Sequence, residues 1–137
     1  MASFRKLAVW EKAHALTVLT YQMAEQHLRR RHPELAAQLT RATASIPANI
    51  AEGVAHRSDA QLNRFLDMAY ASSQEADYHL LLAKDLDALP LSAYAHLEAR
   101  LAEVRQMLSG LRRRVQSRLR DKGKRGGRMA SPLTPVT

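Results

Sequence analysis

The chain has 137 residues, 46% of them hydrophobic, which is enough apolar material for one domain with one core. It has no cysteine, which excludes disulfides and thiolate metal sites, and we expect it in the cytoplasm. Its formal net charge of +8 indicates an acidic partner. Met1 to Trp10 contains no signal-peptide core, and no apolar run reaches about 18 residues, so we predict no membrane association.

The first predicted helix spans about residues 7–31, and its apolar side chains form two neighbouring rows. One row comprises Trp10, Ala13, Thr17, Tyr21, Ala24 and Leu28, and the other comprises Val9, Leu16, Leu19 and Met23. A helix inside one small bundle needs an apolar stripe of only about 100°. The surplus indicates a second buried contact, such as a subunit interface.

A second helix is predicted from Pro33 to about Ala55, because proline suits the first turn of a helix. Its buried row is predicted to comprise Leu35, Leu39, Ala42, Ile46 and Ile50. Pro47 lies inside this helix, where it removes one backbone donor and leaves the carbonyl of Thr43 without its usual partner. We expect a kink at Pro47, not an end, and a nearby Ser or Asn side chain as the substitute donor.

The segment from Ser58 to Gln61 has the Ser-x-x-Gln form of a capping box, so it is predicted to begin a third helix that stops before Pro90. A fourth helix is predicted from about Ser92, with apolar residues at spacings of three and four as far as Val115. Short connections make successive helices antiparallel neighbours. Residues 1–119 are therefore predicted to form an all-α, up-down-up-down four-helix bundle, and residues 120–137 a disordered basic tail.

The positive charge is concentrated near the end of the chain. Residues 58–91 contain six acidic and two basic side chains, whereas residues 92–137 contain eleven basic and three acidic ones. Nine of these basic residues are candidates for contacts to nucleic-acid phosphates, namely Arg112, Arg113, Arg114, Arg118, Arg120, Lys122, Lys124, Arg125 and Arg128. The alternative for this run is a solvated, solubilising tail.

A polar stripe runs along the second predicted helix. Its members Arg41, Ser45, Asn49 and Glu52 recur at steps of four, four and three, and Glu75 on the third helix is a candidate partner for Arg41. We interpret these five residues as a buried polar network that fixes helix packing, in preference to a ligand site, because cores retain polar groups that are paired.

The sequence offers no catalytic motif, and we predict neither an enzyme nor a cofactor. It lacks a nucleophile elbow, a His-Glu-x-x-His zinc motif, a phosphate loop and a dinucleotide fingerprint. A di-iron bundle would need two Glu-x-x-His pairs, and the pair formed by Glu11 and His14 alone has that spacing. No metal site is therefore predicted.

Residues 39–53 read Leu-Thr-Arg-Ala-Thr-Ala-Ser-Ile-Pro-Ala-Asn-Ile-Ala-Glu-Gly, which resembles the hallmark of the 23S rRNA intervening-sequence protein family. Residues 9–13 and parts of residues 64–75 support the resemblance, although Ser72 stands where that family leads us to expect glycine. The resemblance implies a four-helix bundle that assembles into a ring of five subunits without known catalytic activity. Some members are encoded inside insertions in bacterial ribosomal RNA genes. A related branch, the accessory proteins of diversity-generating retroelements, binds a reverse transcriptase and nucleic acid.

Two functions follow from these observations. The first is a non-catalytic, ribosome-associated or nucleic-acid-associated homopentamer whose partners are RNA or DNA, a reverse transcriptase or a ribosomal component. The second is a structural or protein-interaction ring whose positive charge is incidental. A third, a metal-dependent helical enzyme, has in its favour only the incomplete set of Glu and His pairs. No aromatic residue follows Tyr94, so we expect recognition of phosphates and shape without base stacking by the tail.

Overall fold

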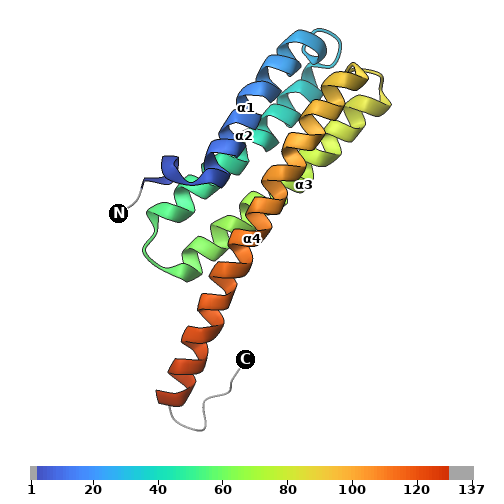
Figure 1. The fold of residues 1–137 in the computed structure, drawn as a ribbon. Coiled ribbons are helices and arrows are strands. Elements are labelled where there is room, and N and C mark those ends of the chain that lie inside the picture. The colour runs from blue at the N-terminus through green and yellow to red at the C-terminus, as the bar shows by residue number, and fades with distance from the viewer. Residues whose placement is uncertain (1–2, 130–137) are drawn as a thin grey trace.

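The computed structural model describes residues 3–129, and four long helices make up the fold (Figure 1). They are α1 (Ala8–Met23), α2 (Pro33–Ala55), α3 (Asp59–Asp85) and α4 (Leu91–Met129). A short 3-10 turn, η1 (Phe4–Lys6), precedes α1, and a π-helical turn, η2 (Ala24–Leu28), continues it. Residues 3–129 contain no strand, so the predicted all-α class is confirmed.

Each helix packs against two others: α1 and α3 both lie against α2 and α4. The chain reverses direction at each connection, as the colours in Figure 1 show. Side-chain pairs agree with this course, because Asp59 pairs with Arg118 at 3.2 Å, whereas Asp77, further along α3, pairs with Arg105 at 3.6 Å, nearer the start of α4. The predicted up-down-up-down order is the order that the helices follow.

The buried row predicted for α2 is confirmed. Leu35, Leu39, Ala42, Ile46 and Ile50 expose at most 7% of their surface. Removing such side chains from water stabilises the fold by about 1.5 to 3 kcal/mol for each large one. The helix also continues through Pro47, which is itself buried. The row at spacings of three and four on α4 supplies the opposite wall of the core, through Leu97, Leu101, Val104, Leu108 and Val115.

At its C-terminal end α2 comes unusually close to α3. A Cβ atom at Gly53 would lie 2.9 Å from the Cβ of Phe65 and 3.1 Å from a methyl carbon of Leu62. Atoms in van der Waals contact need more room than this, so the two helices can meet at this distance only because position 53 has no side chain. Gly53 is buried and helical, and its negative φ shows that space, not backbone conformation, explains the glycine.

The wide apolar arc predicted on α1 is only partly buried in the single chain. The residues of α1 and η2 that face the core are Val9, Ala13, Leu16, Thr20, Ala24 and Leu28. Five of them come from the two predicted rows, and Thr20 belongs to neither row. On the neighbouring face, Val18 is 44% exposed and Tyr21 is 47% exposed. The core of one protomer therefore leaves apolar surface of α1 uncovered.

The ends of α3 are fixed by local contacts. The hydroxyl of Ser58 accepts a hydrogen bond of 3.1 Å from the backbone N–H of Gln61, which confirms the predicted N-cap. At the other end Asp87 has a φ of 54°, and the backbone N–H of Ala88 reaches back to the carbonyl of Ala83. This left-handed position closes the helix and turns the chain towards α4.

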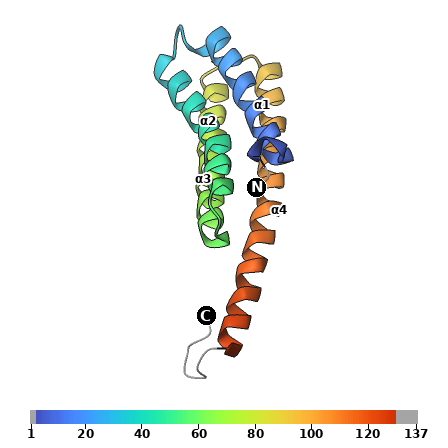
Figure 2. The same ribbon diagram turned by 90° about the vertical axis from the view of Figure 1, so that its left-hand side faces the viewer.

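Helix α4 continues beyond Leu119, where the sequence predicts the helix to end, and residues 120–129 are helical. Arg118 and Lys122 hold this part of the helix on Asp59, and Arg and Lys favour helix extension once a helix has formed. Figures 1 and 2 show the end of α4 projecting past the connection between α2 and α3. Residues 130–137, the rest of the predicted tail, lie outside the described residues.

Candidate nucleic-acid interface

The structure divides the nine candidate basic residues into three groups. Arg112, Arg118 and Lys122 form ion pairs with carboxylates of α3. Arg113, Arg114, Arg120 and Lys124 are exposed, and none of them has an ion pair with the described side chains, residues 3–124. The side chains of Arg125 and Arg128 lie outside the described part. The acidic segment 58–91 contains α3 and the basic segment 92–137 contains most of α4, so an acidic helix lies beside a basic one.

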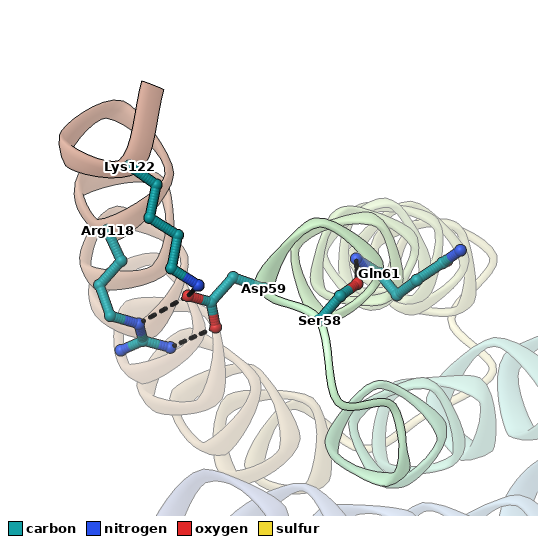
Figure 3. A network of polar contacts seen from close by, with 5 residues as sticks. All are labelled: Ser58, Asp59, Gln61, Arg118 and Lys122. Carbon is teal, nitrogen blue, oxygen red and sulfur yellow. Dashed lines mark hydrogen bonds and ion pairs between the residues drawn. The ribbon is translucent and has the colours of Figure 1, made fainter. Parts of the chain in front are cut away.

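Asp59 accepts contacts from two basic residues at once (Figure 3). Nε and one terminal nitrogen of Arg118 each lie 3.2 Å from a different carboxylate oxygen, and Nζ of Lys122 lies 3.2 Å from one of them. The hydrogen bond from Arg118, followed by that from Lys122, holds the pKa of Asp59 below its ordinary value. Because Asp59 is also the first residue of α3, its charge is favoured by the helix dipole.

Arg112 is fixed by a carboxylate and an aromatic ring. Its Nε and one terminal nitrogen lie 3.0 and 2.8 Å from Oδ1 of Asp67. Its guanidinium carbon lies 4.4 Å from the ring centre of Tyr70, which is one turn further along α3. A guanidinium over an aromatic face is attracted to the ring. Arg112 therefore joins α3 to α4 and is held inside the chain.

Three of the four exposed residues form a row on one side of α4. Arg113, Arg120 and Lys124 are separated by steps of seven and four residues, which places them on the same helix face. Arg114 lies on a different face, beside the N-terminal segment around Leu7. The row begins with Arg113, which lines a pocket together with Tyr70 of α3, and continues towards the end of α4 that extends past the other helices in Figure 2. It presents cations to solvent at intervals of about 6 to 10 Å along the helix.

The polar stripe on α2 is divided in the same way. Nδ2 of Asn49 donates to the carbonyl of Ser45 at 2.8 Å and to its hydroxyl at 2.9 Å. Arg41 and Glu52 are exposed, and Glu75 lies 3.5 Å from Nε2 of His79. Among the described side chains, no ion pair joins Arg41 to Glu75. Ser45 and Asn49 thus meet, and the three charged residues lie outside the contact.

The residue that completes this contact was missed by the sequence interpretation. The hydroxyl of Ser72 on α3 donates to the hydroxyl of Ser45 on α2 at 2.9 Å. Ser72 is the position where the sequence departs from the expected glycine. That departure was the available signal, because a hydroxyl in place of a hydrogen atom adds a donor on the face that meets α2.

The carbonyl of Thr43 has a partner that the local sequence did not indicate. The hydroxyl of Thr17 on α1 lies 3.3 Å from it and 2.8 Å from the carbonyl of Ala13. The one hydrogen of the Thr17 hydroxyl is shared with the nearer carbonyl of Ala13, so the carbonyl of Thr43 receives a weaker contact from another helix, and the expectation of a nearby Ser or Asn donor is wrong. Asn49 donates instead to Ser45, one turn back along α2.

Two further features bear on the class of protein. Among the described residues, no group of three His, Asp or Glu side chains is arranged to hold a metal ion. Over the same part of the chain, every helix is too short or too polar to cross a bilayer.

Comparison with known proteins agrees with the helical architecture. Residues 5–110 match the model of the family described as 23S rRNA-intervening sequence protein. The matched region runs from η1 to the middle of α4 and includes α2 with its internal proline. No protein with a curated description is similar enough to count as a match. Since the family match covers well over half of the chain, this chain belongs to the 23S rRNA-intervening sequence protein family.

Proposed function

We propose that the chain is a non-catalytic, cytoplasmic subunit of a homo-oligomer, a ring of five copies, that binds nucleic acid through α4. The observation that carries the proposal is the exposed row of Arg113, Arg120 and Lys124 along one face of that helix. A row of cations without ion pairs to the described side chains suits a polyanion, whose phosphates it can contact without regard to sequence.

Structured RNA is the proposed nucleic acid, and a nucleic-acid enzyme such as a reverse transcriptase, or a ribosomal component, is a further proposed partner. The family name refers to 23S rRNA, which supports RNA. Five subunits would bring five copies of the row together, and linked sites bind more tightly than one alone. The exposed apolar surface at Val18 and Tyr21 supports self-association.

A structural or protein-interaction ring is the second candidate. The pairing of Arg112, Arg118 and Lys122 with Asp67 and Asp59 favours it, because three of the nine cations already neutralise charge inside the chain. In this case the exposed cations would serve solubility.

Fluorescence-anisotropy titration of structured RNA and duplex DNA separates the two candidates. The parent chain is expected to bind both, with an affinity that falls about a hundredfold or more between 50 and 200 mM salt if about five phosphate contacts form. Arg120→Gln combined with Lys124→Gln should weaken binding, as should truncation after Val115. The matched control, Arg30→Gln with Arg31→Gln, removes the same charge from exposed residues of the connection between η2 and α2 and should bind like the parent.

Equal affinity of the Arg120/Lys124 variant and the control would exclude the row on α4 as the binding surface. Absence of binding by the parent at low salt would leave the protein-interaction ring as the better function.

A further inference from the structure

An open pocket of about 590 Å³ lies between α3 and α4, on the side of α4 that carries the exposed row. Tyr70 contributes from α3, and the other lining residues come from α4: Ala102, Arg105, Gln106, Ser109 and Arg113. The polar side chains of this lining are two guanidiniums, two hydroxyls and an amide, and it contains no carboxylate. Such a lining is rich in hydrogen-bond donors and carries positive charge, which suits an oxyanion.

Arg105 lies in the pocket wall in contact with Asp77 and Tyr70, and one of its donors has no partner in the described part of the chain. One terminal nitrogen lies 3.6 Å from Oδ2 of Asp77, which is a long ion pair. Its Nε is buried and has no hydrogen-bond partner in the described part of the chain. Buried donors of charged groups are ordinarily paired, so the unmet nitrogen marks the Arg105 guanidinium as one that its own chain satisfies only partly.

The pKa of the Tyr70 phenol indicates the sign of the electrostatic potential in the pocket. Arg105 lies beside it, and this contact lowers the pKa of Tyr70, with smaller contributions in the same direction from the hydroxyl of Ser109 and the charge of Arg112. A phenol whose ionised form is favoured lies in a positive potential. The same potential attracts an anion from solvent.

Arg113 connects the pocket to the exposed row. It lines the pocket and is also the first member of the row that continues through Arg120 and Lys124. A single carboxylate would contact the pocket alone. A chain of phosphates can contact the pocket and the row together, because both lie along the same face of α4.

We propose that the pocket formed by Tyr70, Arg105, Ser109 and Arg113 binds one backbone phosphate of a nucleic acid, and so fixes where the strand begins to follow α4. The inference rests on the proposed nucleic-acid function and adds a specific subsite to it. Arg105 and Arg113 donate to phosphate oxygens, and Ser109 supplies a neutral donor between them. Asp77 holds Arg105 in position from α3.

The first test measures RNA affinity of the full chain with single substitutions. Arg113→Gln removes an exposed side chain with no ion pair to the described residues, so its effect on folding should be small. It should weaken binding about three- to tenfold at low salt and reduce the slope of log affinity against log salt by about one. Arg105→Gln should do the same. The control Arg100→Gln removes an exposed arginine from a different face of α4 and should leave both quantities unchanged.

The second test observes the pocket itself. The pKa of the Tyr70 phenol can be followed by NMR in protein labelled on the tyrosine rings, with Tyr70→Phe to assign its signal. A bound phosphate should raise this pKa, because its negative charge opposes ionisation of the phenol. A short single-stranded RNA is the probe.

The two tests separate the pocket from the function on which it rests. If the parent binds RNA but Arg113→Gln and Arg105→Gln behave like Arg100→Gln, and the Tyr70 signal does not move, the pocket proposal is overturned and the proposed function stands. If the parent binds no RNA at low salt, the proposed function is wrong. The proposal that the pocket binds a nucleic-acid phosphate is then wrong as well.

Discussion

The hydroxyl of Ser72 lies 2.9 Å from the hydroxyl of Ser45 and joins α3 to α2 at the middle of the bundle. Ser45 in turn accepts from Asn49, so three polar side chains form a chain of hydrogen bonds within a largely apolar contact. Asn49 is 9% exposed, and both of its partners are on Ser45, one turn back along α2. The bond that depends on the packing of the two helices is the one from Ser72 to Ser45, which would be lost if α3 shifted along α2. The contact therefore favours one register of α2 against α3.

Asn49→Ala is expected to lower the free energy of unfolding by about 1 to 3 kcal/mol, because the substitution removes the two hydrogen bonds that the Asn49 amide donates to Ser45. Thermal unfolding followed by circular dichroism measures the effect. Arg41→Ala is the comparison: Arg41 is exposed in the single chain, where its replacement should change stability by less than about 0.5 kcal/mol. A loss as large as that of Asn49→Ala would show that Arg41 is covered in the assembled protein.

Gly53→Ala is expected to destabilise the bundle by about 1 to 3 kcal/mol, since the added methyl group would meet the Cβ of Phe65 at 2.9 Å. Gly110→Ala is the matched control on α4. Its new Cβ would lie 3.6 Å or more from its nearest neighbours, which are the ends of flexible arginine side chains. That substitution should stabilise the helix by about 0.5 to 1 kcal/mol. Equal effects of the two substitutions in chemical denaturation would contradict the close approach of α2 and α3.

Asp59→Asn tests the contact between α3 and the end of α4. The pKa of Asp59 is lowered in the folded protein, so its contribution to stability is present above the unfolded pKa of about 3.9 and is lost as the pH falls through the folded value. At pH 7 the variant should be less stable by about 0.5 kcal/mol, as expected for ion pairs near the surface. The difference should disappear at a pH below the folded pKa.

Asp85→Asn is the control for this titration, because Asp85 is exposed and has no ion pair among residues 3–124. Melting temperatures of both variants and the parent, measured from pH 2 to pH 7, should show a pH-dependent loss for Asp59→Asn alone. The same pH dependence in both variants would mean that the ion pairs of Asp59 with Arg118 and Lys122 do not form in solution.

The assembly is expected to have about five times the mass of the 15.4 kDa chain, as a closed ring of five like subunits requires. Light scattering coupled to size-exclusion chromatography measures this mass. Val18→Asp with Tyr21→Asp should reduce it, because the two substitutions place charges on the exposed apolar face of α1. Leu91→Asp changes an exposed leucine at the start of α4 and serves as the control. A monodisperse monomer at micromolar concentration would rule out the ring.

Much of the fold could be predicted because the deciding contacts are local. Proline at position 33 fixes a backbone angle that suits the first turn, and α2 begins there. Ser58 caps α3 through a residue three positions away. The buried row of α2 follows from 3.6 residues per turn, which the sequence displays directly.

The candidate site could not be predicted in the same way, because its partners are distant in the sequence. The basic run indicated nine equivalent cations, but Asp59 and Asp67 engage three of them across 45 to 63 residues. Likewise, the spacing of Arg41, Ser45 and Asn49 placed them near one another on α2. It did not show which of them α3 would cover and which would stay exposed.

The sequence by itself thus determined where helices α1 to α3 form and which faces are apolar, since these properties depend on neighbours within one or two turns. Tertiary structure decided which cations stay free, why Thr17 reaches the carbonyl of Thr43, and where Arg105 meets Tyr70. The reason is geometric: helix rotation and register are set by the packing of four helices at once, and a shift of one residue turns a side chain by about 100° around its helix.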